Sequence, residues 1–274
     1  MATEGFELAS GDRVGSFRIV AALGPARYAA VHVASPRRAI VHVAAVESWR
    51  ETAVHVLRTA RVIETLAHPG IAPIVERGVL PDRRPWWAAE VPSGVALYDL
   101  IARRTMPAGE LAELVRDLGD VLATAHARGV IHRALTLRSI VLATGERAFP
   151  LAITDWGLQT RELGVYAAPE GDGAAADVYA VGVIAHRAAT RVFPVDRGVG
   201  DLSALPGELA SLITRMLALD PDARPAAAEL AGRAQPFVAR TFPRFSRPKW
   251  TPAPPVAVVP ALVPERARTD KPEA

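Results

Sequence analysis

Alternating apolar and polar positions dominate the first part of the chain. Residues 17–47 alternate in this way and are rich in β-branched side chains, a pattern typical of half-buried strands. The turn-forming pairs Gly24-Pro25 and Ser35-Pro36 interrupt the pattern, so the sequence predicts three consecutive strands there. Two further short strands are predicted around residues 72–79 and 86–91.

Helical periodicity replaces this alternation further along the chain. Residues 51–67 carry apolar side chains every three to four positions, and the pattern stops at the turn His68-Pro69-Gly70. After Gly94 a long helix is predicted, with an apolar stripe formed by Leu111, Leu114, Leu118, Val121, Leu122 and Ala125. Further helices are predicted at 177–190 and 207–218, and short strands around 140–142 and 151–153.

The order of these elements predicts an α+β fold with two lobes. A β-rich lobe at residues 12–92 precedes a larger helical lobe at 93–239, and a chain of 274 residues is long enough to bury a core in each. Residues 1–11 are predicted to be an N-terminal extension. They contain two acids and lack a basic start followed by an apolar run, so no secretory signal is expected.

The last segment, residues 240–274, has a different composition. Eight of its 35 residues are proline, and the run from Pro252 to Pro264 cannot form a core helix or a central strand. The segment is predicted to be an extended, disordered linker or docking region. It also carries the chain's basic excess, with seven Lys and Arg against three Asp and Glu, whereas the part before it has 25 against 26.

Composition and charge exclude several classes of function. Cysteine is absent, which excludes disulfides, thiolate metal sites and a cysteine nucleophile. The part before residue 240 is nearly neutral, so nucleic-acid binding is not expected. The chain has no stretch of 18 or more apolar residues, so no membrane span is expected. A cytoplasmic protein is therefore predicted, of unknown oligomeric state.

Lysine is nearly absent from the chain. It occurs only at Lys249 and Lys271, against 30 arginines. The codon usage of a GC-rich genome explains scarce surface lysines, but a lysine with a chemical role would be expected to persist. Any chemistry in residues 1–248 must therefore proceed without one.

Five short motifs occur in an order that is specific to one family. They are Ile131-His132-Arg133-Ala134, Thr154-Asp155-Trp156-Gly157, Ala168-Pro169-Glu170, Asp177-Val178-Tyr179-Ala180-Val181-Gly182 and Asp220-Pro221-Asp222-Ala223-Arg224-Pro225. With this order and spacing, residues 12–238 resemble bacterial serine/threonine protein kinases. The resemblance implies a protein-kinase-like fold, and it identifies the positions at which a kinase needs particular side chains.

The resemblance places a glycine-rich phosphate-binding loop at the first hairpin. Where the family has three glycines followed by a valine, this chain has Gly24, Ala26, Ala29 and Val31. Pro25 removes one backbone donor, and each added Cβ hinders the approach of backbone to phosphate. An ordinary hairpin turn is therefore favoured over a working phosphate cradle.

The family's ATP-binding lysine aligns with His42 on the third strand. Imidazole is shorter than a lysine side chain and mostly neutral at pH 7, whereas charge-assisted bonds from a lysine contribute about 1.5–3 kcal/mol each. The glutamate partner of that lysine aligns with Thr59, and Glu64 lies about 140° further round the same helix. The resemblance places adenine beside Glu90 at the hinge, where Pro92 lacks the N–H that family members donate.

The catalytic loop departs furthest from the family. Ala134 stands at the position of the catalytic aspartate, Thr136 at that of a lysine, and Ser139 at that of a metal-binding asparagine. A general base must lie within hydrogen-bonding reach of the acceptor hydroxyl, and Ala134 has no carboxylate. Asp155 aligns with the family's magnesium-holding aspartate, but a lone carboxylate makes a poor magnesium site.

Positions that serve architecture in the family are retained. The resemblance implies that Glu170 pairs with Arg224, and that Asp177 accepts hydrogen bonds from the backbone of the catalytic loop. The other retained structural positions are His132, Arg133 and Gly157.

The loss of the catalytic side chains, together with the retention of the structural ones, predicts a catalytically inactive kinase homologue, a pseudokinase. It would bind and regulate an unidentified protein partner. On this interpretation no cofactor is expected beyond weak ATP or Mg²⁺ binding. Asp155 is the remnant of a metal site, and the remnants of a nucleotide site are Gly24, Val31, His42 and Glu90. Two alternatives remain. One is an atypical ATP-dependent kinase or other nucleotide-dependent transferase that uses Asp155 and His42, and the other is a structural adaptor that docks through the proline-rich tail.

Overall fold

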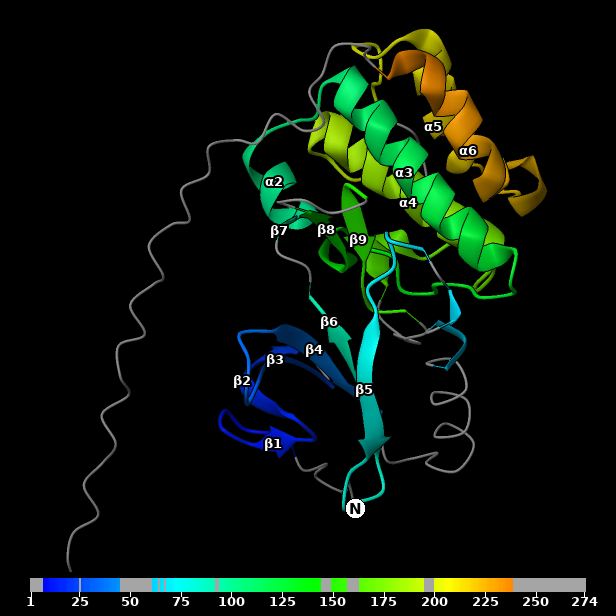
Figure 1. The fold of residues 1–274 in the computed structure, drawn as a ribbon. Coiled ribbons are helices and arrows are strands. Elements are labelled where there is room, and N and C mark those ends of the chain that lie inside the picture. The colour runs from blue at the N-terminus through cyan, green and yellow to red at the C-terminus, as the bar shows by residue number, and fades with distance from the viewer. Residues whose placement is uncertain are drawn as a thin grey trace, which may run out of the picture.

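The computed structural model has two lobes, a sheet-rich one and a helical one, stacked along the long direction of the molecule (Figure 1). It describes residues 7–24, 26–44, 61–63, 65–66, 68–91, 94–143, 149–156, 163–194 and 200–238. The predictions made for Thr59, Glu64, Pro92, Gly157 and residues 240–274 lie outside the described residues. The α+β prediction with a small β-rich lobe is confirmed.

The small lobe is built on one antiparallel sheet. Its strands are β1 (Arg13–Val14), β2 (Phe17–Gly24), β3 (Arg27–His32), β4 (Arg38–Val43), β5 (Ile74–Val79) and β6 (Pro85–Glu90). They lie side by side in the order β1-β2-β3-β4-β6-β5. The alternating segment at 17–47 therefore forms β2, β3 and β4 as predicted, whereas the two-residue β1 escaped the sequence pattern.

The two central strands of this sheet carry the core of the small lobe. β4 is buried at every position after Arg38, and β6 is buried from Pro85 to Ala89. Central strands that are covered on both faces read as continuous apolar runs rather than as alternation. The resulting cluster contains Val14, Phe17, Ile19, Tyr28, Ala30, Ala39, Val41, Val43, Trp86 and Ala88.

The large lobe consists of helices that stand on a small second sheet. The helices are α2 (Leu97–Arg103), α3 (Ala108–His126), α4 (Ala174–Thr190), α5 (Gly207–Met216) and α6 (Ala227–Ala234), with 3-10 turns η2 (Leu137–Ser139), η3 (Gly164–Tyr166), η4 (Pro221–Ala223) and η5 (Gln235–Phe237). The sheet contains β7 (Gly94–Ala96), β8 (Ile140–Ala143) and β9 (Leu151–Ile153), paired in that order. It lies at the end of the large lobe that faces the small lobe (Figure 1).

Helix α3 is the centre of the large lobe, and the apolar stripe predicted for it is buried throughout. Its backbone approaches α6 closely at Gly119, because a Cβ at that position would lie 2.6 Å from Leu230 Cβ and 3.1 Å from the Ala227 carbonyl oxygen. Among the described residues, none of the helices is both long and apolar enough to cross a bilayer.

Two glycine-to-alanine changes test this close approach. Gly119→Ala should destabilise the domain by about 1–2 kcal/mol, since overpacking against α6 outweighs the better helix propensity of alanine. Gly232→Ala, at a site on α6 where an added Cβ meets nothing, should stabilise it by about 0.5–1 kcal/mol. Urea unfolding of both variants measures the difference, and equal stabilities would contradict the packing described here.

A short contact joins the second sheet to the chain that leads into β5. Ile71 forms a parallel bridge with Ile153 at the end of β9, with hydrogen bonds from Ala72 N to the Ile153 carbonyl (3.0 Å) and from Ile153 N to the Gly70 carbonyl (2.8 Å). The residues that follow β9 are thereby held against the small lobe, where the candidate site lies.

Candidate functional site

The site is centred on Asp155, two residues beyond β9, at the junction of the two lobes. Asp155 is only 8% exposed, and its carboxylate contacts two basic side chains of the small lobe. Arg27 donates from Nε to Oδ1 at 3.2 Å and lies 3.0 Å from Oδ2 through a terminal nitrogen. His42 Nε2 lies 3.3 Å from Oδ1. The carboxylate therefore sits between two potential donors from neighbouring strands.

Strand pairing explains why Arg27 and His42 converge. They are register partners on β3 and β4, so their side chains leave the same face of the sheet. The imidazole is fully buried and stacks on Trp87, with 4.9 Å between ring centroids and 21° between the planes. Neither ring nitrogen has a well-aligned hydrogen bond within the described residues, and such orphaned buried groups cost about 1–3 kcal/mol.

Charge around Asp155 favours its ionised form. Burial by itself would raise the pKa of this carboxyl, but the nearby His42 and Arg27 outweigh burial and hold the pKa below its ordinary value. Asp155 also has a positive φ of 65°, a backbone conformation that costs about 1–3 kcal/mol in a non-glycine residue and that clusters at functional sites. The structure thus maintains a buried anion in a strained position.

Arg27 puts a permanent positive charge next to Asp155, although residues 1–248 contain no lysine. The resemblance predicts a cation only at the lysine position, where this chain has His42. Arg27 supplies the charge from the adjacent strand instead. A signal for it was present, since Arg27 lies four residues before Val31, and residues separated by an even number along a strand share a face.

The other residues predicted as remnants of a nucleotide site lie along the same sheet. Gly24 ends β2 opposite Arg27, Val31 is half-buried on β3, and Glu90 ends β6 with its N–H bonded to the Pro73 carbonyl. Of the predicted site residues, the structure thus brings His42 and Asp155 together with Arg27.

His132 supports the catalytic loop from the interior. It is fully buried, its Nε2 lies 2.8 Å from the Thr154 carbonyl oxygen, and its Nδ1 accepts the Ala134 N–H at 3.2 Å. Burial lowers the pKa of His132, which agrees with a neutral ring that donates from Nε2 and accepts at Nδ1. Trp156 packs against this ring at 4.7 Å and donates to the Ile153 carbonyl at 2.9 Å.

Asp177, at the start of α4, holds the backbone of the same loop. It accepts hydrogen bonds from the backbone N–H of His132 at 2.8 Å and of Arg133 at 3.0 Å. His126 Nε2 also lies 2.8 Å from its Oδ2. These bonds hold Arg133 at a positive φ of 68°, so the loop keeps a defined path around position 134.

The other two aligned positions of the loop, Thr136 and Ser139, form hydrogen bonds with each other. The Ser139 hydroxyl accepts from the Thr136 N–H and donates to the Thr136 carbonyl, both at 2.9 Å, and Ser139 is fully buried. The Thr136 hydroxyl accepts from Arg138 N at 3.2 Å. Ser139 therefore caps the η2 turn, and its hydroxyl is engaged in bonds with the Thr136 backbone. In the described part of the chain, no three His, Cys, Asp or Glu side chains gather as a metal site.

Glu170 and Arg224 form an ion pair on the large lobe. Arg224 has a fully buried side chain, and its two terminal nitrogens reach the two carboxylate oxygens, one of them at 2.9 Å. The hydrogen bonds from Arg224 lower the pKa of Glu170. The same guanidinium also donates to the carbonyls of Ala218 and Ala175.

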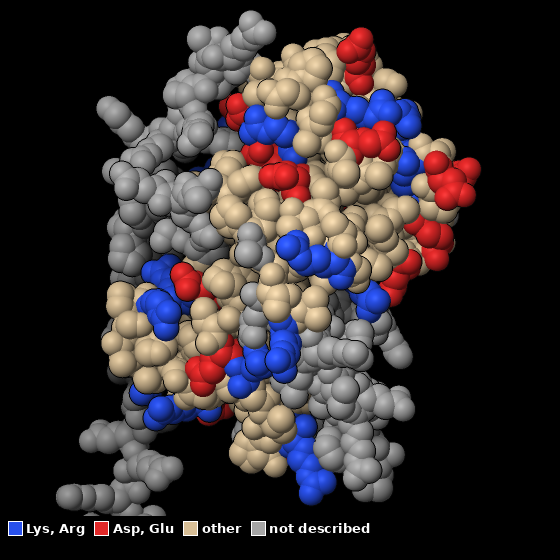
Figure 2. Space-filling view, turned by 45° about the vertical axis from the view of Figure 1, so that its right-hand side comes forward, with Lys and Arg blue, Asp and Glu red and all other residues tan. Residues whose placement is uncertain are grey.

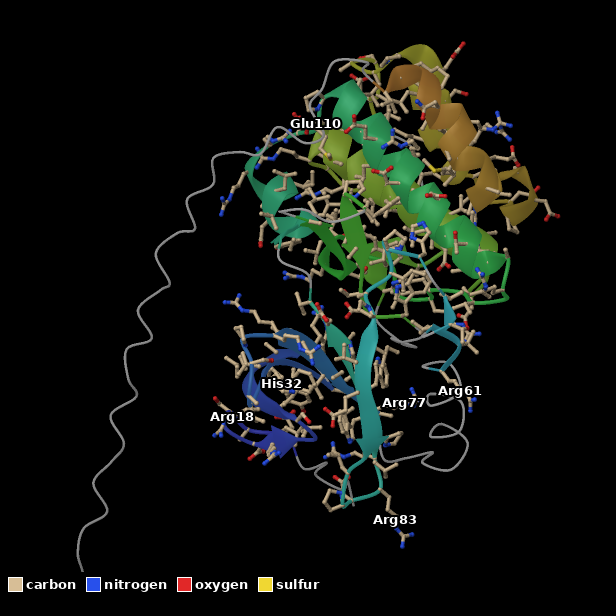
Figure 3. All side chains as sticks on the ribbon, viewed as in Figure 1. Arg18, His32, Arg61, Arg77, Arg83 and Glu110 are labelled. Atoms are coloured by element: carbon tan, nitrogen blue, oxygen red, sulfur yellow. The ribbon has the colours of Figure 1, made fainter. Side chains whose placement is uncertain are left out.

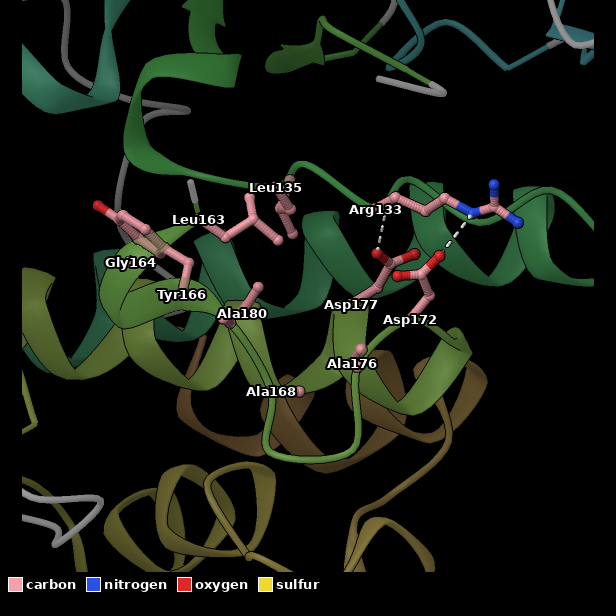
Figure 4. A pocket seen from close by; sticks show the side chains of 12 residues that line it. Arg133, Leu135, Leu163, Gly164, Tyr166, Ala168, Asp172, Ala176, Asp177 and Ala180 are labelled. Atoms are coloured by element: carbon pink, nitrogen blue, oxygen red, sulfur yellow. Dashed lines mark hydrogen bonds and ion pairs between the residues drawn. The ribbon is translucent and has the colours of Figure 1, made fainter. Parts of the chain in front are cut away.

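A cavity of about 220 Å³ lies beneath the catalytic loop. Figure 4 shows Arg133 and Leu135 of the loop on one side, Leu163 and Tyr166 of the following segment on another, and Asp172 close to the Arg133 guanidinium. Arg133 Nε lies 3.7 Å from Asp172 Oδ2. The cavity lies on the large-lobe side of the junction, next to the position of Ala134.

Curated relatives of the chain are serine/threonine-protein kinases. The chain is 27% identical over 242 residues to serine/threonine-protein kinase pkn2 of Myxococcus xanthus, covering 72% of this chain and 29% of that protein. It is 30% identical over 210 residues to Pkn1 of the same organism, covering 67% and 30%. It is 28% identical over 222 residues to PknJ of Mycobacterium tuberculosis, covering 71% and 37%. The chain thus spans about a third of the length of these relatives.

No protein-family model matches the chain. The named relatives support a kinase family and a protein-kinase-like domain, in agreement with the resemblance found in the motifs. They contradict the prediction that the chain is not an enzyme, because the proteins it matches are named as kinases. That prediction depended on single aligned positions and did not consider a cation on the adjacent strand, such as Arg27.

Proposed function

We propose that the chain is an atypical nucleotide-dependent phosphotransferase of the serine/threonine-kinase type, which binds ATP at the junction of its lobes. The observation that carries the proposal is the cluster of Arg27, His42 and Asp155 at the lobe junction. It combines cationic and imidazole donors with a buried carboxylate, at the position where the resemblance puts the triphosphate and its metal.

The roles follow from the chemistry of the three side chains. Arg27 would exchange its bonds to Asp155 for bonds to phosphate oxygens, since its guanidinium fork fits either anion. His42 would donate to the same phosphates from a ring nitrogen that now has no aligned partner. Asp155 would hold Mg²⁺ together with the phosphates, as that ion commonly binds one or two carboxylates plus substrate oxygens.

The alanine at position 134 is expected to lower the rate of phosphoryl transfer without changing the type of reaction. Phosphoryl transfer depends mainly on positioning and on electrostatic stabilisation of the phosphoryl oxygens. A general base typically adds a factor of about 10²–10⁴. A domain that retains the phosphate and metal groups but lacks the base is therefore expected to transfer phosphate slowly, to a serine or threonine hydroxyl of a protein.

Nucleotide binding tests the role of Arg27. ATP with Mg²⁺ at about 100-fold excess over Kd should stabilise the domain by about 2.7 kcal/mol. Arg27→Gln should weaken ATP binding by about tenfold or more, because it removes charge-assisted bonds to phosphate. Isothermal titration measures the affinity, and thermal unfolding shows whether each variant is folded.

The matched control is Arg18→Gln, on the outer side of the small lobe (Figure 3), where an exposed arginine has no place in the cluster. Arg18→Gln should bind ATP as the unchanged protein does. The proposal fails if ATP produces no stabilisation, or if transfer of radiolabel to a protein acceptor is the same after Asp155→Asn.

A second candidate function is the binding of a protein partner, and the cavity beneath the catalytic loop supports it. This role is compatible with slow phosphotransfer.

A cytoplasmic location remains a prediction. Docking through residues 240–274 is tested by deleting them and measuring whether the partner is still captured.

A further inference from the structure

Two arginines lie over aromatic rings on the surface next to the catalytic loop. The Arg138 guanidinium carbon lies 3.8 Å from the centre of the Tyr98 ring, and that of Arg187 lies 4.8 Å from the centre of the Phe193 ring. Tyr166 meets Phe193 edge-to-face at 5.6 Å. We call these five residues the cation–aromatic surface.

The surface is assembled from separate parts of the chain. Tyr98 comes from α2, Arg138 from η2, Tyr166 from η3 and Arg187 from α4, and Phe193 follows α4. Tyr166 belongs to this surface, because its ring contacts Phe193, over which Arg187 lies. Burial raises the pKa of the Tyr166 phenol, and Arg187 and Arg138 both oppose the rise. The direction of these effects agrees with both guanidinium groups lying on the side of the large lobe that carries Tyr166.

Among the described arginines of the large lobe that form no ion pair, Arg138 and Arg187 are the two that lie over an aromatic ring. Arg104, Arg116, Arg224 and Arg233 each pair with an acid, and Figure 2 shows acidic and basic side chains interspersed over one face of this lobe. Within the described residues, neither Arg138 nor Arg187 forms an ion pair. Stacking on a ring restricts a guanidinium without using its donors, so both remain available for an external anion.

Exposed apolar side chains adjoin the aromatic residues along the chain, since Val165 precedes Tyr166 and Val192 precedes Phe193. Val165 is 48% exposed, Val192 is 54% exposed and Tyr98 is 40% exposed. Tyr166 also lines the 220 Å³ cavity that reaches Arg133 and Leu135, so the cavity adjoins one residue of this surface. A cavity of this size takes a side chain, and exposed apolar groups beside cations fit a polypeptide better than a polyphosphate chain.

We propose that the cation–aromatic surface binds acidic residues of the protein substrate, close to the serine or threonine that accepts phosphate. This inference rests on the proposed function, because only a phosphotransferase has such a protein substrate. The expected substrates are polypeptides with Asp or Glu beside the acceptor residue. The part of the chain before residue 240 has 25 Lys and Arg against 26 Asp and Glu. The attraction therefore comes from the local pair of arginines and not from net charge, and the guanidinium fork matches a carboxylate in geometry.

Peptide binding in the absence of nucleotide tests the surface. The probes are a fluorescent peptide with serine between glutamates, and the same peptide with glutamine in place of each glutamate. At low salt the full chain should bind the glutamate peptide about tenfold more tightly, because two cations meet several carboxylates. Arg138→Gln and Arg187→Gln should each weaken it by about fivefold. Fluorescence anisotropy gives the affinities.

Two further variants sharpen the result. Arg18→Gln, on the other lobe, removes the same charge and should leave binding unchanged. The double variant Arg138→Glu with Arg187→Glu should prefer a lysine-flanked peptide, an inversion that a merely unfolded variant would not produce. Equal affinity for the glutamate and glutamine peptides, or equal weakening by Arg18→Gln, would overturn the proposal. Displacement of the peptide by inorganic phosphate at matched charge would also overturn it, by assigning the surface to phosphate.

The outcome is separable from that of the proposed function. If the glutamate peptide binds through Arg138 and Arg187 but receives no label from ATP, the acidic-peptide surface stands and phosphotransfer fails. If label is transferred equally to glutamate and glutamine peptides that bind equally, phosphotransfer stands and this surface fails.

Discussion

On the proposed function, replacing Ala134 by aspartate should increase the rate of phosphotransfer by about 10²-fold or more. The change puts a carboxylate at the position where the resemblance locates the general base, and a positioned base contributes about 10²–10⁴. The loop is already held for such a group, because Asp177 bonds the N–H groups of His132 and Arg133 and His132 bonds that of Ala134.

The matched control is Ala134→Asn, which has nearly the same size and shape as aspartate but cannot accept a proton at neutral pH. Steady-state transfer of label to a serine-containing acceptor measures both variants. Since position 134 is buried, thermal unfolding must show that the aspartate variant is folded. The proposal is that the site lacks only its general base. Equal rates for the aspartate and asparagine variants, or no transfer by either, would contradict it.

The fold was predictable because each lobe has a simple apolar pattern. The alternation at 17–47 corresponds to three strands of one sheet, and the stripe beginning at Leu111 corresponds to the buried face of α3. The short elements β1 and β7 were missed, since two or three residues carry no period. Helix α6 packs against α3 at Gly119, a contact between distant segments that no local pattern contains.

The candidate site could be predicted from the sequence only where the identity of a single residue determines the chemistry. Ala134 lacks a carboxylate in any fold, so its consequence could be stated from the sequence. Arg27 required the register between β3 and β4, because only that pairing places it beside His42. Ser139 was predicted to be a poor metal ligand, but its bonds to Thr136 depend on the local turn. The cation–aromatic surface joins five segments and left no signal in the sequence.

Replacing Arg224 by alanine should destabilise the domain by about 2–4 kcal/mol. Removal of one partner from a buried ion pair costs about 3–5 kcal/mol, and the expected value is reduced here because the Glu170 side chain is 25% exposed and partly screened by water. The change also removes the donors to the Ala218 and Ala175 carbonyls. Urea unfolding at neutral pH measures the loss.

The pH dependence identifies the charge contribution to this loss. Arg224 lowers the pKa of Glu170 in the folded protein, so the ion pair stabilises the fold above the ordinary glutamate pKa and stops doing so as the pH falls through the lowered value. The difference between the original protein and the Arg224→Ala variant should therefore narrow on acidification. The part that remains at low pH comes from the other contacts of Arg224, which are its bonds to the Ala218, Ala175 and Leu219 carbonyls and its position over the Tyr179 ring.

Arg233→Ala is the control for this comparison, because Arg233 forms an exposed ion pair with Glu229 within α6. Exposed pairs contribute little to stability, so this variant should unfold near the original midpoint. If Arg224→Ala were no less stable than Arg233→Ala, the pair would not anchor the segment before α4. The cavity and the cation–aromatic surface that share this segment would then need another support, since Tyr166 is only four residues from Glu170.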